Sequence, residues 1–136
     1  MERALQDRLR TALSGNVGSV HVRPAIDWHE RKSNDASAFP AIVLTTVSPG
    51  RTYDLDGADG LSQPRVRLEI FATTPLTAKA VKNAAIAELE QPATLSGIRF
   101  HRSRLAFERD TDPEDLPGGM KVFRTILDFF VPNSQA

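Results

Sequence analysis

The fold of this chain is decided by the stretch RVRLEIFATTPLTAKAVKNAAIAEL, residues 65–89. Its first eight residues alternate between apolar side chains at even positions and mostly charged ones at odd positions, which is the period of a half-buried strand. Thr74 is a suitable N-cap, Pro75 suits the first helical position, and an apolar stripe then continues to Leu89 before Pro92. The stretch therefore predicts a strand followed directly by a helix.

The flanking segments predict further elements. Residues 41–47, preceded by Phe39 and Pro40, are apolar at both parities and predict a central strand covered on both faces. Residues 98–109 and 122–131 predict a hairpin, and a parity change inside the first of them favours a bulge. Residues 2–13 predict an amphipathic helix and residues 20–23 a short strand. We interpret residues 25–38 as a polar surface loop, 54–60 as turn chemistry and 110–119 as an acidic loop.

This order of elements lacks a regular alternation of strand and helix, so it indicates an α+β fold. We expect a mostly antiparallel sheet of four to five strands, with two helices packed on one face and long polar loops. Residues 1–132 are predicted to form a single domain, and residues 133–136 a frayed tail.

Composition narrows the function classes. The 136 residues include 17 Lys and Arg against 17 Asp and Glu, so the basic footprint of a nucleic-acid-coating protein is missing. The chain contains no cysteine, which excludes disulfides, thiolate nucleophiles and cysteine-based metal sites. The longest uncharged stretch, residues 36–50, is shorter than the roughly 20 apolar residues of a membrane span. Charged side chains are spread through residues 1–10, which contain no continuous apolar segment, so we expect no secretory signal and an intracellular protein.

The sequence carries no recognisable catalytic motif. His21, Asp27, His29 and Glu30 lie close in sequence but lack the spacing of known zinc signatures. The aspartates between residues 54 and 59 do not have the EF-hand spacing. We therefore expect no catalytic residue, no metal and no cofactor.

One predicted sheet face combines large apolar groups with opposite charges. It carries Arg67, Glu69 and Phe71 on one strand and Arg124, Ile126, Asp128 and Phe130 on another. Monomers rarely leave such a face uncovered, so either the long loops fold over it or another subunit packs on it. Both interpretations remain open from the sequence alone.

Other interface candidates are weighed against simpler roles. Trp28 either anchors its own loop or contacts a partner. The second predicted helix carries charges opposite to those that its macrodipole favours, with Lys79 and Lys82 in its first half and Glu88 in its last turn. This arrangement arises either by chance or because these side chains face a neighbouring subunit. The acidic residues of two segments form either solvated loops or docking surfaces: Asp54, Asp56, Asp59, Asp110, Asp112, Glu114 and Asp115.

Several blocks, taken in order, resemble the tail-completion proteins of long-tailed bacteriophages and prophages, also called tail terminators or head-to-tail joining proteins. The blocks that carry the resemblance are ERAL (residues 2–5), FPAIVL (39–44), YDLDG (53–57), GL (60–61), RVRLEIFA (65–72), the Ala-rich helix (77–89), GIR (97–99), ERD (108–110) and LDFFV (127–131). Phe71 departs from the family, which more often has tryptophan there, and so does the charged segment from Asp27 to Ala38 with its Trp28.

The resemblance implies a non-enzymatic virion protein, made in the bacterial cytoplasm and incorporated into the tail. It would cap the head-proximal end of the tail tube, commonly as a six-membered ring, stop tube growth and dock the head connector. Its expected partners are further copies of itself, the tail tube protein and the connector, with duplex DNA passing through unbound and no membrane. We hypothesise that the two acidic segments face the lumen or the docking partners. The alternatives are another neck or tail-tube component, or a small enzyme or ligand-binding domain with an unrecognised site, for which loss of turnover on mutating His29 would be the test.

Overall fold

The computed structural model describes residues 1–17, 20–22, 24–31, 39–48, 51–54 and 57–135, with the side chains of residues 16–17, 20–22, 51–54 and 57–60 left undescribed. The helices are α1 (Glu2–Leu13) and α2 (Pro75–Leu89). The strands are β1 (Gly15–Val17), β2 (Val20–Val22), β3 (Ala25–Trp28), β4 (Ala41–Ser48), β5 (Arg51–Asp54), β6 (Gly57–Ser62), β7 (Arg65–Ala72), β8 (Ala93–Leu95), β9 (Ile98–Phe100), β10 (Arg104–Leu116), β11 (Met120–Phe130) and β12 (Asn133–Gln135).

The main sheet has five strands in the order β10-β11-β7-β4-β3. Its pairs are antiparallel except β3 with β4, which is parallel. β4 lies between β7 and β3, and its first four residues are buried, as their apolar character at both parities predicts. The expected strand-to-helix unit is also present, because Thr74 caps α2 by accepting a hydrogen bond from the backbone N–H of Thr77 at 3.2 Å.

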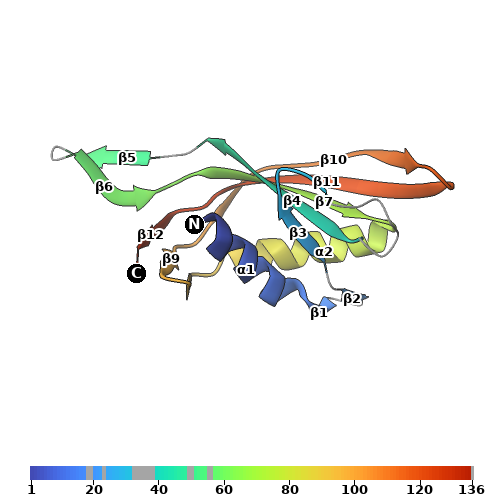
Figure 1. Cartoon of the computed structure of the whole chain (residues 1–136), viewed down its shortest axis with the longest axis horizontal. Coiled ribbons are helices and arrows are strands. Elements are labelled where there is room, and N and C mark those ends of the chain that lie inside the picture. Colours follow the sequence, from blue (N-terminus) through green and yellow to red (C-terminus); the bar gives the residue numbers. More distant parts are fainter. Residues whose placement is uncertain (18–19, 23, 32–38, 49–50, 55–56, 136) are drawn as a thin grey trace.

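Both helices pack against one face of the main sheet and leave the other face without a helix (Figure 1). The core between them is formed by α1, α2 and the alternate residues of the strands that point toward the helices. Its largest fully buried members include Leu5, Leu9, Leu44, Leu68, Leu89, Phe100, Leu127 and Phe129. The α+β fold with two helices on one face is therefore confirmed.

A second sheet, in the order β5-β6-β12-β9-β8, extends from one end of the main sheet. β5 and β6 form a hairpin that projects at this end, while the β10–β11 hairpin projects at the opposite end (Figure 1). A small separate hairpin, β1 with β2, follows α1. Two projecting hairpins make the molecule elongated rather than a plain two-layer block.

Two predicted loops are partly strand. Residues 25–28, expected in a surface loop, form β3 at the edge of the main sheet because α1 holds them there: Gln6 donates to the carbonyl of Ile26 and the indole N–H of Trp28 donates to the carbonyl of Glu2. Residues 32–38 lie outside the described part of the chain. The segment predicted as turn chemistry, residues 54–60, supplies the end of β5 and most of β6.

Three predictions about the C-terminal half are wrong. Residues 98–109 are not one bulged strand, because the chain leaves the second sheet after Phe100 and enters the main sheet at Arg104. The acidic segment is the second half of β10, and only residues 117–119 turn the chain, with Gly118 and Gly119 at positive φ. The supposed frayed tail forms β12, where Asn133 is buried and pairs with Phe100.

Candidate functional site

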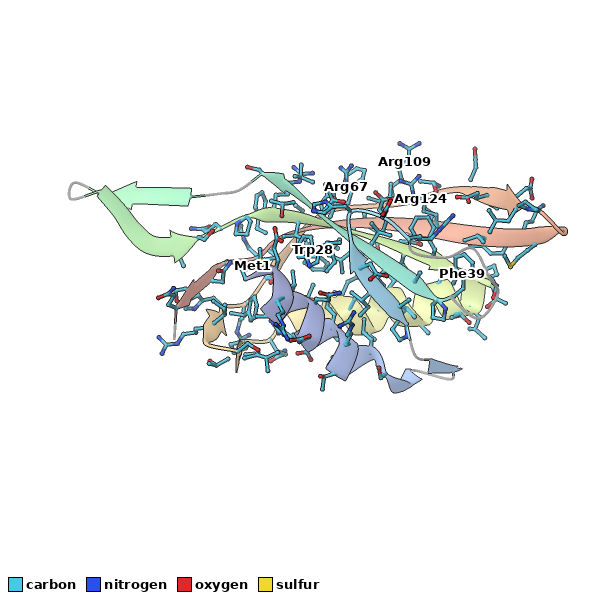
Figure 2. All side chains as sticks on the ribbon, in the orientation of Figure 1. Met1, Trp28, Phe39, Arg67, Arg109 and Arg124 are labelled. Carbon is cyan, nitrogen blue, oxygen red and sulfur yellow. The ribbon has the colours of Figure 1, made fainter. Side chains whose placement is uncertain are left out.

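The helix-free face of the main sheet brings together side chains from four strands in rows. One row runs Thr45, Arg67, Asp128, Phe107 across β4, β7, β11 and β10, and the next runs Val43, Glu69, Ile126, Arg109. Figure 2 shows Arg67, Arg109 and Arg124 on this side of the sheet, away from the helices. All seven residues that the sequence placed on one face of β7 and β11 lie here: Arg67, Glu69, Phe71, Arg124, Ile126, Asp128 and Phe130.

At one end of this face, two arginines share a single aspartate. The side chain of Asp128 is 0% exposed, while those of Arg65 and Arg67 are about one third exposed. Arg65 donates from Nη2 at 2.7 Å and from Nε at 3.1 Å to Oδ2 of Asp128. Arg67 donates from Nε to Oδ1 at 2.8 Å and from Nη2 to Oδ2 at 3.1 Å. The buried carboxylate thus fixes both guanidinium groups in place.

This geometry determines the direction in which the pKa values of Asp128 and Arg67 are shifted. Burial raises the pKa of the Asp128 carboxyl, but the hydrogen bonds and positive charges of Arg67 and Arg65 outweigh burial and hold the pKa below its ordinary value. The hydrogen bond to Asp128 raises the pKa of Arg67. The cluster is therefore ionised at neutral pH and carries one more positive than negative charge.

The other end of the face is a shallow cavity of about 400 Å³ with Phe71 in its lining. Arg124 donates to Glu69 at 2.6 Å, and Arg31 donates to Glu114 at 3.0 Å. The guanidinium carbons of Arg31 and Arg124 lie 4.6 and 5.8 Å from the Phe71 ring centroid. Three carboxylates, those of Glu30, Glu69 and Glu114, line this cavity with the two guanidinium groups, so this end has no excess of positive charge.

Large apolar side chains on the face remain open to solvent. Val47 is 46% exposed and Phe107 is 39% exposed, while Ile126 and Phe130 are half-buried. Arg104 stacks over Phe130 with its guanidinium carbon 5.5 Å from the ring centroid. The cations described on this face are all arginines, and arginine with aromatic residues is the composition typical of protein interfaces, from which lysine is depleted.

Three of the remaining candidates have partners within their own chain. Trp28 packs against the core and donates its indole N–H to the carbonyl of Glu2 at 3.2 Å. Nζ of Lys82 lies 3.3 Å from Glu108, and Glu88 accepts from Nε of Arg8 at 2.9 Å. Lys79 is exposed. These contacts account for Trp28, Lys82 and Glu88 without a second subunit.

The acidic candidates are not one cluster. Asp110 points toward α2 and accepts from the hydroxyl of Thr125 at 2.8 Å, whereas Glu114 pairs with Arg31 over the helix-free face. Asp112 and Asp115 are exposed near the tip of the hairpin. Asp54 and Asp59 lie in β5 and β6, whose side chains are not described there, and Asp56 lies outside the described residues.

The sequence prediction missed four arginines of this surface, namely Arg31, Arg65, Arg104 and Arg109. Arg65 could have been found from its odd position in the alternating stretch beside Arg67. The other three could not have been found from the sequence. Arg104 and Arg109 lie on this face because of the pairing register of β10, and Arg31 reaches it from the segment after β3.

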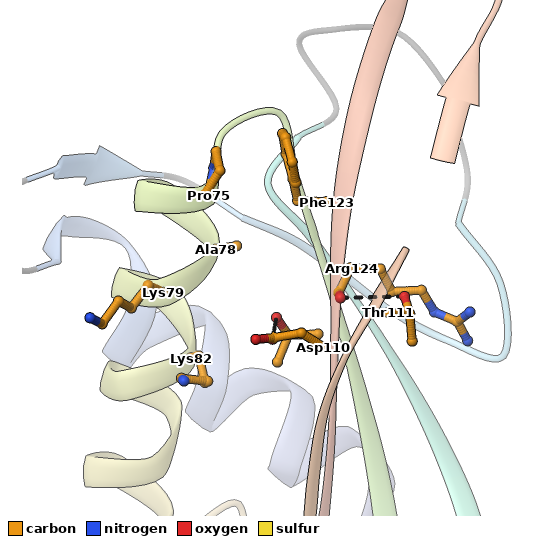
Figure 3. Close-up of a pocket in the computed structure, with 9 residues that line it drawn as sticks. Pro75, Ala78, Lys79, Lys82, Asp110, Thr111, Phe123 and Arg124 are labelled. Carbon is orange, nitrogen blue, oxygen red and sulfur yellow. Dashed lines mark hydrogen bonds between the residues drawn. The ribbon is translucent and has the colours of Figure 1, made fainter. Parts of the chain in front are cut away.

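A second cavity of about 410 Å³ separates the first half of α2 from β10 and β11 (Figure 3). Lys79 points away from the strands, and Asp110 points toward the helix but already accepts a hydrogen bond from Thr125. These polar groups do not form a nucleophile–base arrangement of the kind that enzymes use. Elsewhere in the described ranges, no three His, Asp or Glu side chains gather closely enough to hold a metal ion.

No protein-family model and no curated protein matches this chain. Among the residues that the structure describes, neither helix is long and apolar enough to cross a membrane. The helix-free face of the main sheet therefore stands as the candidate site on its geometry and composition alone.

Proposed function

We propose that this chain is a structural assembly subunit of a phage or prophage tail, which caps the head-proximal end of the tail tube as a ring. The observation that carries the proposal is the helix-free face, with its fixed arginines, exposed Phe107 and Val47 and half-buried Ile126. Such a face suits burial against another protein better than exposure to water.

The shape of the chain supports the same proposal. A ring requires each subunit to offer two different complementary surfaces, because head-to-tail contacts are heterologous. The helix-free face is one such surface, and the two hairpins that project from opposite ends of the molecule supply further ones (Figure 1). The ring would stop tube growth on one side and dock the head connector on the other, with duplex DNA passing through its lumen.

Electron microscopy of the purified protein and of particles from the strain that carries its gene tests this proposal. The purified chain should form closed rings with a central hole, and loss of the gene should give overlong tails that are not joined to heads. Open tubes formed by the chain alone would instead identify a tail-tube component. Tails of normal length joined to heads in the absence of the gene would contradict the proposal.

A further inference from the structure

The helix-free face has an uneven charge distribution. The end around Phe71 pairs Arg31 and Arg124 with Glu114 and Glu69 and also carries Glu30 in its lining, so positive charge is not in excess there. The other end, which we call the cationic half, consists of Arg65, Arg67, Arg104 and Arg109 around the single carboxylate of Asp128. Four arginines against one aspartate leave a formal charge of +3 on the cationic half.

The cationic half retains hydrogen-bond donors for a partner. Arg65 and Arg67 use only Nε and Nη2 to bind Asp128, so within the described part of the chain their Nη1 groups make no hydrogen bond. The side chains of Arg104 and Arg109 are exposed and form no ion pair with any described residue. Guanidinium groups held in this way match carboxylates, to which they donate paired hydrogen bonds.

Carboxylates without partners lie at the far end of the same sheet. β7 pairs with β11 only as far as Ala72 opposite Phe123, so beyond this point β10 and β11 continue as a projecting tip (Figure 1). Asp112 is exposed where this tip begins and Asp115 is exposed on the tip itself, and neither forms an ion pair among the described residues. The tip can therefore reach a neighbouring molecule with both carboxylates available.

We propose that the acidic tip of one copy, with Asp112 and Asp115, docks on the cationic half of the next copy. This inference rests on the proposed function, because it names the surfaces that meet between successive subunits of the ring. A second copy is the occupant that the charges favour, since 17 positive residues equal 17 negative ones, while the arginines and the carboxylates without ion pairs to described residues lie at opposite ends of the sheet. Two different patches on one subunit make a heterologous contact, which closes into a ring when the rotation allows.

Duplex DNA is the other polyanion that could meet four arginines. The cationic half does not suit a run of phosphates, because its aspartate is buried and the exposed apolar side chain of Phe107 lies beside that aspartate. An acidic protein segment uses both the charge and the apolar surface, so it accounts for more of the observed side chains.

Charge reversal tests the contact. The face variant carries R104E and R109E, and the tip variant carries D112K and D115K; both change exposed side chains without ion pairs to described residues. The matched control carries R99E and R102E, two exposed arginines that belong to β9 and to the connection before β10 rather than to a strand of the main sheet, with the same change in net charge as the face variant. Circular dichroism checks that each variant is folded, and light scattering gives its mass at about 0.05 M salt, where screening is weak.

The wild type and the control should assemble alike. The face variant and the tip variant, each alone, should need at least about tenfold higher concentration to assemble, because like charges then oppose each other. An equimolar mixture of the two variants should restore assembly, since alternating copies again place opposite charges at every contact. High salt should weaken the wild-type assembly.

Several results would overturn the inference: a wild type that stays monomeric at low salt, single variants that assemble like the wild type, or a mixture that fails to rescue. Tight binding of duplex DNA that only the face variant loses, with self-association unchanged, would assign the cationic half to DNA instead. If the charge-reversal variants form closed rings as readily as the wild type, the inference about the contact is wrong and the proposed function is unaffected. Rescue by mixing that gives open chains or dimers would support the contact and contradict the ring.

Discussion

Arg67 donates two hydrogen bonds to Asp128, one from Nε at 2.8 Å and one from Nη2 at 3.1 Å, and Arg65 donates to Oδ2 of the same carboxylate. The carboxylate is fully buried, so its charge depends on these two arginines. A buried ion pair is costly to break, because the remaining charge has neither water nor a partner.

Replacing both arginines should therefore lower the free energy of unfolding by more than replacing one of them. We expect R67A to lower the free energy of unfolding by about 1 kcal/mol, since Arg65 still binds Asp128. The double variant R65A/R67A should lower it by about 2–3 kcal/mol, because it removes both donors to the carboxylate, although water can then reach Asp128. Urea denaturation measures both values, with R99A/R102A as a control that should stay within about 0.5 kcal/mol of the wild type. A double variant no less stable than this control would show that Asp128 does not depend on the pair.

Asp128 should also make stability depend on pH. Its folded-state pKa is lowered, so its contribution is fully present above the ordinary value of 3.8 and is lost as the pH falls through the folded-state pKa. The stability difference between the wild type and D128N should thus be constant from about pH 7 to pH 5 and shrink at lower pH. Denaturant titrations at a series of pH values measure it, and a difference that grows on acidification would contradict the assigned charge state.

Arg8 should be the residue that joins the two helices. It is 4% exposed and donates from Nη2 to the carbonyl oxygens of Glu88 and Gln91, each at 2.6 Å, at the C-terminal end of α2. R8A leaves these groups without their donor, and we expect it to cost about 2–4 kcal/mol of unfolding free energy. E88Q should cost less, because Glu88 is one third exposed and its carbonyl still accepts from Arg8. Equal costs for R8A and E88Q in thermal unfolding would disprove this assignment.

The N-cap of α2 offers a smaller and more local test. Thr74 accepts from the backbone N–H of Thr77 in an exposed position, so T74A removes one capping bond and little packing. We expect a loss of about 1 kcal/mol, with T74S and T74D close to the wild type. Equal stability of T74A and T74S would mean that Pro75 alone determines where the helix begins.

The strand-to-helix unit was predictable because its signals are local. Alternation over residues 65–72, an N-cap and a proline at the first helical position each depend on neighbouring residues. The edge strand β3 was not predictable in this way. Its four residues include Asp27, and they are held by Gln6 and by the contact of Trp28 with Glu2. Contacts with residues about twenty positions away leave no local pattern.

The acidic half of β10 is a second element that the sequence alone did not predict. Asp, Pro and Gly favour loops in an isolated segment, but β11 supplies the partner that keeps this segment extended. Pro113 is tolerated because it lies at a register shift between Thr111 and Glu114 on an edge strand. The same register places Arg109 beside Ile126, so the sequence predicted the two-strand part of the candidate site but not the arginines from β10.

Under the proposed function, copies of this chain join head to tail into a ring. Size-exclusion chromatography with light scattering, on the wild-type protein over a wide concentration range at low salt, measures the mass of that assembly. We expect a species of six times 14.9 kDa, or a mass that climbs toward it with concentration. A monomer at every concentration, or a tight dimer that never grows, would contradict it.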